Sequence, residues 1–333
     1  LFCCRRNFAS RLRDTLPAGS LMPLFSIVAP FLNERESAER FAAFADKLAH
    51  EFESRYGFEL EVVLVADDSI DRYRQHLKGN WRIIELSRNF GKEIALYAGL
   101  AETRGDYVMM IDADLQHPYD VCLQMVAELM ADPRLDVVYT IRDDRNEESM
   151  KKALAGRFFY WLINFRQRFE VPENAGDFRV MNRAAVDALL RVRDKRRFNK
   201  GLYAWAGFRQ KGIYYKPDPR LSGTTKWSRL GLIALSVEGI VSFSALPLRI
   251  MSIIGVLTGL AGIVYGGHII ISSLVFGTDL PGYPSLMSAI SVLGGFNLAL
   301  LGLLGEYIWV TIAEVKDRPL YIVRKVHRPD DAS

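Results

Sequence analysis

Cysteine is scarce in this sequence, and the few thiols that it has do not form a recognisable framework. The 333 residues include only 3 cysteines, at Cys3, Cys4 and Cys122. Their spacing matches neither a disulfide scaffold nor a zinc site, and such usage suits a reducing compartment such as the cytoplasm. We expect Cys122 to be an inert thiol in the hydrophobic core.

An excess of charge of one sign is also missing. The chain has 43 Lys and Arg against 39 Asp and Glu, a formal net charge of +4. Because the basic residues are spread along the chain, nucleic-acid binding gains little support. Basic residues beside apolar stretches favour contact with anionic lipid headgroups instead. Residues 1–22 are arginine-rich but contain no long apolar run, so we interpret them as an extension and not as a signal peptide. This extension is either a membrane-surface tail or a segment without a role.

Charge is almost absent from two long segments near the C-terminus. Among Asp, Glu, His, Lys and Arg, residues 250–276 contain only His268, and residues 285–312 contain only Glu306. Each segment exceeds the roughly 20 apolar residues that cross a bilayer, so we predict two transmembrane helices within residues 249–313. Lys and Arg flank the pair on its outer sides and not in the connecting loop. The positive-inside rule then places both termini and the preceding domain in the cytoplasm, at the inner membrane.

Glycines recur in the first of these segments at the small-xxx-small spacing that lets membrane helices approach closely. This pattern is compatible with a homo-oligomer, although glycine is common in membrane helices in any case. The glycines are Gly255, Gly259, Gly262 and Gly266.

The region before the apolar segments alternates between two periodicities. Short apolar runs at residues 24–29, 60–66, 81–86, 107–111 and 137–140 predict buried strands. Amphipathic helices are expected after Ser37, over 92–103, and from Pro118 to 131. This alternation predicts a doubly wound, mainly parallel α/β sheet for residues 23–226. Residues 227–248 form either an interfacial amphipathic helix or a buried core helix, and we interpret residues 314–333 as a basic cytoplasmic tail.

Polar clusters follow three of the predicted strands, where such sheets bind their ligands. Asn33 and Glu34 follow the first strand, and Asp67 follows the second. Asp112 and Asp114 follow the fourth. Carboxylates of this kind suit Mg²⁺ or Mn²⁺, which complete their coordination with substrate phosphates. A lone Asp-x-Asp is usually a solvated turn, but acids beyond neighbouring strands favour a metal site that handles a nucleoside diphosphate.

The ordered motifs resemble the family 2 glycosyltransferases with the GT-A fold, and within them the polyprenyl-phosphate glycosyltransferases. This group includes dolichol-phosphate mannose synthases and bactoprenol glucosyltransferases of O-antigen modification. The resemblance covers residues 24 to about 326. It rests on Pro-Phe-Leu-Asn-Glu at 30–34, Ser-Arg-Asn-Phe-Gly-Lys-Glu at 87–93, Asp-Ala-Asp-Leu-Gln at 112–116 and Ala-Gly-Asp-Phe-Arg at 175–179. Gly-Glu-Tyr at 305–307, Arg-Pro-Leu-Tyr at 318–321 and the paired apolar segments look most like the bactoprenol branch.

The resemblance implies roles for individual residues. It puts Asp114 and Gln116 on the metal, Mg²⁺ or Mn²⁺, with Asp114 and Asp177 as catalytic residues. Asp177 stands where relatives often have a candidate base, but it can equally position the sugar. The nucleotide-sugar would be held by Pro30, Asn33, Glu34, Asp67, Arg88, Lys92, Asp112 and Ala113. Where relatives read Asp-Asp-Gly-Ser, this chain has Asp68 in place of the glycine, in the loop expected to contact the nucleobase.

The acceptor in such a reaction is itself an anion, a lipid phosphate that needs cationic positioning more than a base. Candidate residues are Arg142, Lys152, Arg157 and Lys226, for which a solvated basic helix face is the plainer alternative. The resemblance implies an inverting transfer of a sugar, glucose from UDP-glucose, to undecaprenyl phosphate. A processive polysaccharide synthase is the second interpretation, although its Gln-x-x-Arg-Trp motif is missing. An inactive membrane scaffold with this fold is the third, and the intact acids argue against it.

Overall fold

The computed structural model describes residues 22–31, 38–66, 80–143, 150–165, 167–195, 197–217, 246–276 and 282–328. Several predicted features lie outside these residues: the N-terminal extension, most of the amphipathic segment at 227–248, and the side chains of Asn33, Glu34, Asp67, Lys152 and Lys226.

A mixed sheet forms the centre of the N-terminal region, in the strand order β7-β5-β6-β4-β1-β2-β3-β8. Strands β1 to β4 pair in parallel, as predicted, whereas β6 runs antiparallel to β4 and β5, and β8 runs antiparallel to β3. The predicted doubly wound, mainly parallel sheet is therefore confirmed. The strands are β1 (Leu24–Phe31), β2 (Glu59–Ala66), β3 (Trp81–Leu86), β4 (Tyr107–Met110), β5 (Val137–Arg142), β6 (Ala175–Asn182), β7 (Gln210–Tyr215) and β8 (Val323–His327).

Helices cover both faces of this sheet because its central strands are apolar on both sides. Ile27 packs into a core cluster with residues of α2 (Ala38–Tyr56) and α5 (Tyr119–Ala131). The next residue, Val28, joins a second cluster with α4 (Lys92–Glu102) and α7 (Arg183–Arg191). Neighbouring side chains of a strand point to opposite faces, so one apolar run supplies two cores. Cys122 is fully buried in the first core, where burial raises the pKa of its thiol.

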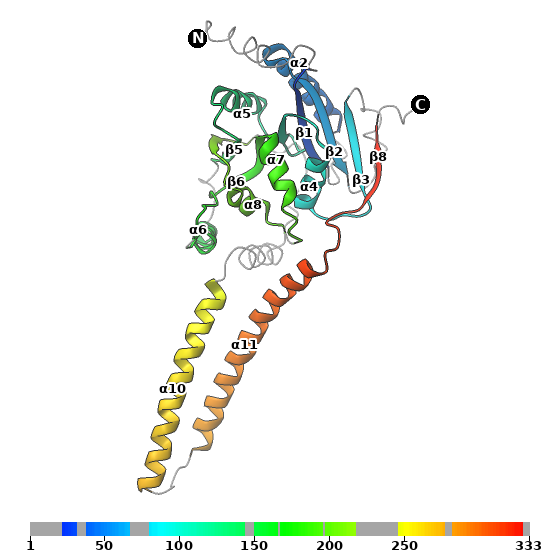
Figure 1. Cartoon of the computed structure of the whole chain (residues 1–333). Coiled ribbons are helices and arrows are strands. Elements are labelled where there is room, and N and C mark those ends of the chain that lie inside the picture. Colours follow the sequence, from blue (N-terminus) through cyan, green and yellow to red (C-terminus); the bar gives the residue numbers. More distant parts are fainter. Residues whose placement is uncertain are drawn as a thin grey trace.

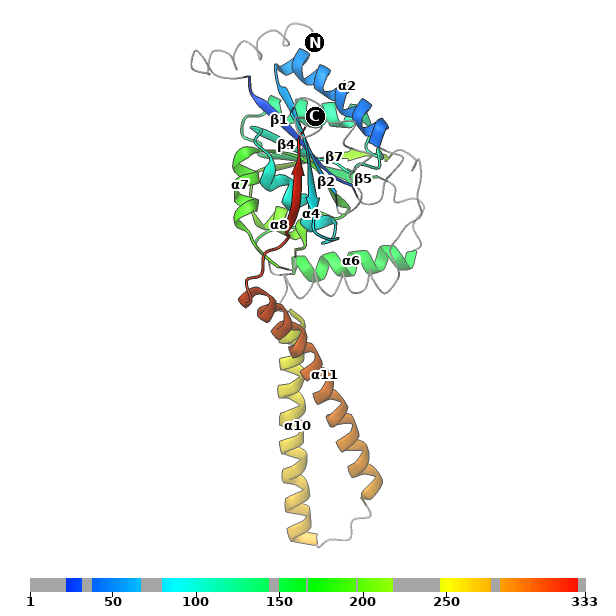
Figure 2. The same cartoon turned by 90° about the vertical axis from the view of Figure 1, so that its right-hand side faces the viewer.

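Two long helices, α10 (Leu246–Phe276) and α11 (Tyr283–Val315), run away from the sheet domain side by side as a hairpin (Figures 1 and 2). Ile250–Ile269 and Val292–Val315 are long and apolar enough to cross a membrane, and 0% of either window is buried within the chain. The two apolar helices are thus where the sequence predicts them. His268 makes a polar contact within α10, with the Ser272 hydroxyl 2.9 Å from its Nδ1.

The chain returns to the sheet after the hairpin, within residues 314–333, which the sequence analysis interprets as a basic cytoplasmic tail. Residues 323–327 form β8 at the edge beside β3. His327 is buried, with its Nε2 3.1 Å from Glu85 Oε2, and Arg324 donates to Glu85 Oε1 at 3.2 Å. These contacts hold the edge strand in place. The boundaries of the predicted domains themselves stay a prediction.

Candidate functional site

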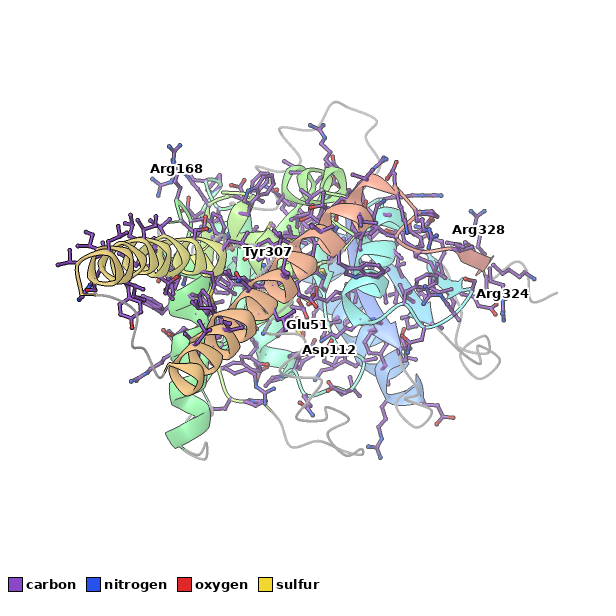
Figure 3. All side chains as sticks on the ribbon, turned by 90° about the horizontal axis from the view of Figure 1, so that it is seen from below. Glu51, Asp112, Arg168, Tyr307, Arg324 and Arg328 are labelled. Carbon is purple, nitrogen blue, oxygen red and sulfur yellow. The ribbon has the colours of Figure 1, made fainter. Side chains whose placement is uncertain are left out.

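The loop that follows β4 gathers the predicted acids at the carboxyl edge of the sheet. Leu115 has a φ of 57°, a left-handed conformation that is uncommon outside glycine. The backbone N–H of Gln116 donates to Asp114 Oδ1 at 3.1 Å, which closes the turn. Ligand atoms of Asp112, Asp114 and His117 lie within 4.8 Å of one another as a result. Figure 3 labels Asp112 in a view from the side of the two apolar helices.

Lys92 joins this loop to two other elements. Its Nζ lies 2.7 Å from Asp112 Oδ1 and 3.6 Å from Asp177 Oδ2. Burial by itself lowers the pKa of Lys92, but the carboxylates of Asp112 and Asp177 outweigh it and raise that pKa above its ordinary value. Burial likewise raises the pKa of Asp112, and Lys92 and His117 more than reverse this. Both Lys92 and Asp112 are therefore charged at neutral pH.

His117 completes the cluster, and the sequence analysis missed it. Its Nε2 lies 3.6 Å from Asp112 Oδ2, and its Nδ1 lies 3.3 Å from the Tyr215 hydroxyl. The imidazole stacks on Phe178 with ring centroids 4.1 Å apart. The sequence does contain a signal for this residue, because His117 directly follows the acidic motif and lies three residues beyond Asp114. The rings of Phe178 and Tyr215, from β6 and β7, fix the orientation of the imidazole.

Three buried polar atoms in and beside the cluster lack a hydrogen-bond partner among the described residues: Gln116 Nε2, His117 Nε2 and Asp177 Oδ1. Buried polar atoms are nearly always paired in folded proteins, and an exception commonly marks a place that a ligand, ion or water fills. The predicted site residues Gln116 and Asp177 thus lie close to Lys92, Asp112 and Asp114. Both keep a buried polar atom that can still form a hydrogen bond.

Glu93, the residue after Lys92, is a second group that the sequence analysis did not single out. Its Oε2 accepts a hydrogen bond from the backbone N–H of Asn199 at 2.9 Å. Burial, together with the negative charge of Asp177, raises the pKa of Glu93 to about 7. This carboxyl group therefore titrates near physiological pH.

The remaining predicted residues lie in several places. Pro30 is buried in β1, and Ala113 is 1% exposed within the acidic loop. Arg88 stacks on the Phe90 ring, 4.0 Å from its centroid, and lines a pocket against α11, not the acidic cluster. Arg142 ends β5 and Arg157 is exposed on α6 (Met150–Asn164). Their roles toward an acceptor stay predictions.

Fold and site together are those of an α/β domain with a cluster of charged side chains at the carboxyl edge of its sheet. Comparison with known proteins makes the class specific. Residues 26–190 match the family described as Glycosyl transferase family 2, and residues 246–309 match the family described as GtrB C-terminal hairpin. The chain therefore belongs to glycosyl transferase family 2 and is a glycosyltransferase.

Relatives match it over nearly their whole length. An uncharacterized glycosyltransferase of Synechocystis is 38% identical over 304 residues, covering 90% of this chain and 94% of the relative. The SfII prophage-derived bactoprenol glucosyl transferase of Shigella flexneri is 37% identical over 309 residues, covering 91% of this chain and 98% of the relative. Among solved structures, mannosyl-3-phosphoglycerate synthase from Rubrobacter xylanophilus is 18% identical with a TM-score of 0.44, over 74% of this chain and 78% of that one.

Proposed function

We propose that this glycosyltransferase transfers glucose from UDP-glucose to a polyprenyl phosphate on the cytoplasmic face of the inner membrane. The observation that carries the proposal is the cluster of Lys92, Asp112 and Asp177 beside Asp114, because it offers both a cation and metal-binding carboxylates at one edge. Relatives named bactoprenol glucosyl transferases support the acceptor and the sugar. The two apolar helices support a place in the membrane, next to an acceptor that cannot leave it.

The residues of the acidic loop fit a divalent cation. Carboxylate oxygens of Asp112 and Asp114 and a nitrogen of His117 come within 4.8 Å of one another, and oxygen and imidazole ligands suit such an ion. We propose Asp114 and Gln116 as ligands of Mg²⁺ or Mn²⁺, with His117 as a further candidate. The ion, when bound, offsets negative charge on the departing nucleoside diphosphate.

The protein groups would divide the remaining work. Lys92 stays cationic beside Asp112 and Asp177, so it can hold a phosphate or a sugar oxygen against the repulsion between two anionic substrates. An acceptor phosphate is already ionised near neutral pH and attacks the anomeric carbon without a strong base. A single displacement of this kind inverts the anomeric configuration. Asp177 then orients a sugar hydroxyl by accepting a hydrogen bond at Oδ1, because its Oδ2 faces Lys92.

Transfer assays on purified full-length protein test this proposal. Radiolabelled UDP- and GDP-sugars are supplied with undecaprenyl phosphate, and the lipid product is counted. Asp114→Asn should lower the rate at least about 100-fold, the usual effect of removing a group that stabilises transition-state charge. Asp120→Asn changes an exposed acid of α5 in the same way and should leave the rate within about twofold.

Three results would contradict the proposal. A full rate for Asp114→Asn excludes the metal site as the catalytic centre. A polymeric product indicates a processive synthase. No lipid-linked sugar from any donor would favour the inactive scaffold.

A further inference from the structure

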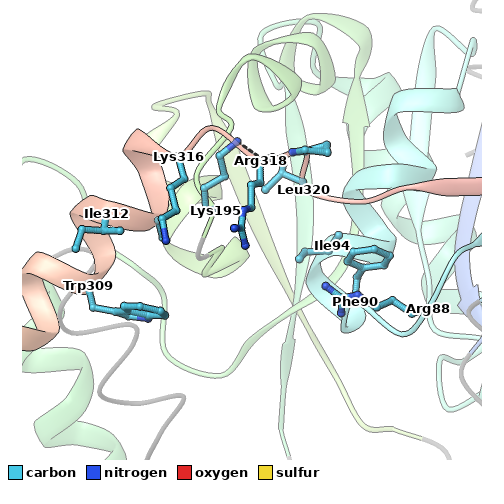
Figure 4. A pocket seen from close by; sticks show the side chains of 11 residues that line it. Arg88, Phe90, Ile94, Lys195, Trp309, Ile312, Lys316, Arg318 and Leu320 are labelled. Carbon is cyan, nitrogen blue, oxygen red and sulfur yellow. Dashed lines mark hydrogen bonds between the residues drawn. The ribbon is translucent and has the colours of Figure 1, made fainter.

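A pocket of about 310 Å³ lies where the end of α11 meets the sheet domain (Figure 4). Its walls come from α11 and the residues after it, from the loop and first turn at 88–94, and from Lys195. Part of the lining is apolar, with Phe90, Ile94 and Trp309 among its members. Four cations also line it, and no acid does: Arg88, Lys195, Lys316 and Arg318. A ligand for this pocket must combine negative charge with apolar surface.

One of the four cations is already neutralised and holds the pocket together. Lys195 Nζ donates to Asp317 Oδ1 at 2.8 Å and to the backbone oxygen of Arg318 at 2.6 Å. The backbone N–H of Lys195 donates to Glu314 Oε1 at 2.6 Å. These bonds tie the end of α11 to the sheet domain and so join the two walls of the pocket.

The other three cations keep their charge available. Among the residues that the structure describes, no carboxylate lies within ion-pair distance of Arg88, Lys316 or Arg318. Arg88 is nevertheless oriented, because its Nη1 donates to the Asn89 backbone oxygen at 3.0 Å and its guanidinium stacks on Phe90. Three cations that line one pocket without an acid favour an anion such as phosphate.

The position of the pocket along α11 identifies the source of that phosphate. The candidate membrane span ends at Val315, immediately before Lys316 and Arg318. Trp309, which is 54% exposed, lies a little under two turns before that end. Tryptophan followed by basic residues at the end of an apolar helix marks the depth of lipid headgroups. Basic pockets beside membrane helices at this depth bind anionic headgroups.

We propose that this pocket binds the phosphate of an anionic bilayer phospholipid, of the phosphatidylglycerol type, which is not the acceptor. None of Lys92, Asp112 and Asp177 lines the pocket, so a lipid held there does not touch the reacting groups. The lipid would bridge α11 to the loop that leads into Lys92, and so set how the catalytic domain sits on the membrane. The inference rests on the proposed insertion of the hairpin, but not on sugar transfer.

Lipid binding to the full-length protein in detergent tests the inference without any nucleotide-sugar. Short-chain phosphatidylglycerol and phosphatidylcholine are titrated separately, and bound lipid is counted by native mass spectrometry. Wild type should prefer phosphatidylglycerol by about tenfold or more, since one charge-assisted hydrogen bond can account for that ratio. The double variant Lys316→Gln/Arg318→Gln should lose the preference. The control Arg209→Gln/Lys325→Gln removes two exposed cations of the sheet domain and should keep it.

Additional arms separate the sources of the phosphate. Equal preference in wild type and in Lys316→Gln/Arg318→Gln overturns the inference, as does inorganic phosphate that displaces the lipid at the lipid's own concentration. If the double variant loses undecaprenyl phosphate and retains phosphatidylglycerol, the pocket belongs to the acceptor and the inference is wrong. A chain that transfers no sugar but shows the predicted lipid preference would contradict only the proposed function.

Discussion

The sheet domain and the α10–α11 hairpin are both rich in apolar residues, but the sheet domain buries them and the hairpin exposes them. Every residue from Phe25 to Phe31 of β1 is buried, whereas Ile263 and Leu274 of α10 are 72% and 82% exposed. Apolar surface left in water forgoes about 25 cal/mol per Å², so the hairpin requires a lipid or protein environment that the sheet domain provides for itself. Apolarity alone does not separate a core strand from a membrane helix; the length of the uncharged run does.

Glycine shows the same contrast. A Cβ added at Gly105 would lie 2.6 Å from Ser26 Oγ and 2.7 Å from the Ser26 backbone nitrogen. At Gly259 in the hairpin it would meet nothing within 4 Å. Glycine in the sheet domain permits close packing within the chain. In the hairpin it leaves a surface that the chain itself does not fill, so the predicted homo-oligomer stays a prediction.

The largest effect should come from the charged cluster of the sheet domain. Lys92→Met leaves Asp112 and Asp177 without their shared cation, and we expect kcat/KM for transfer to fall about 100-fold or more. Lys92→Arg keeps the charge and should recover part of the rate. Steady-state assays alongside thermal unfolding separate lost chemistry from lost fold. A rate for Lys92→Met within threefold of wild type would remove this residue from the site.

The next largest effect should come from a charge placed in the hairpin, because a bilayer disfavours charge and water does not. Ile263→Asp puts a carboxylate near the middle of α10, which costs about 3 kcal/mol if this segment crosses a bilayer. Tyr214→Asp is the matched control, because Tyr214 is 71% exposed on the sheet domain and should change stability by about 0.5 kcal/mol or less. The fraction of each variant recovered in membranes measures the difference. Equal recovery would mean that α10 does not sit in lipid.

Methyl groups added to glycine should have a smaller effect, confined to the sheet domain. Gly105→Ala forces a Cβ against backbone and should lower the free energy of unfolding by about 1–3 kcal/mol. Gly259→Ala meets open space in a helix, where alanine is the better helix former, and should not lower the unfolding midpoint of purified protein. Thermal unfolding of both variants in the same detergent checks this. Similar shifts for the two would contradict the contrast drawn above.

A pH dependence is the last difference that we expect, and it belongs to the sheet domain alone. The pKa of Glu93 is about 7 in the folded protein, raised from 4.5. Because the folded state holds this proton more tightly, the stability contributed is full below pH 4.5 and is lost as pH rises toward 7. The unfolding midpoint of wild type should therefore fall relative to Glu93→Gln over that window. The control Glu39→Gln, on the exposed face of α2, keeps Glu93 and should follow wild type. A wild-type midpoint that does not fall relative to Glu93→Gln across the window would refute the assignment.

The parts of the structure that could be predicted are those whose signal is local. Strands such as β1 and β2 appear as uncharged apolar runs, and α10 and α11 as still longer ones. The acids at Asp112 and Asp114 stand directly after a strand, so their place at the edge of the sheet follows from the topology of parallel sheets.

The parts that escaped prediction depend on contacts between distant residues. β6 enters the sheet between β4 and β5, and no nearby residue specifies that order. His117 is held by Tyr215, 98 positions further along the chain. Glu93 acquires its raised pKa from burial and from Asp177, neither of which its neighbours in sequence reveal.

The late position of β8 has a consequence for how the protein is made. The strand that pairs with the β3 edge, β8, is synthesised after both helices of the hairpin. During translation, the β3 edge therefore has no partner strand while α10 and α11 leave the ribosome. Open strand edges pair readily with other chains. The sheet domain can therefore be completed only after the hairpin has been synthesised. A nascent chain that stalls before residue 323 would expose the unpaired edge of β3, which is prone to aggregation.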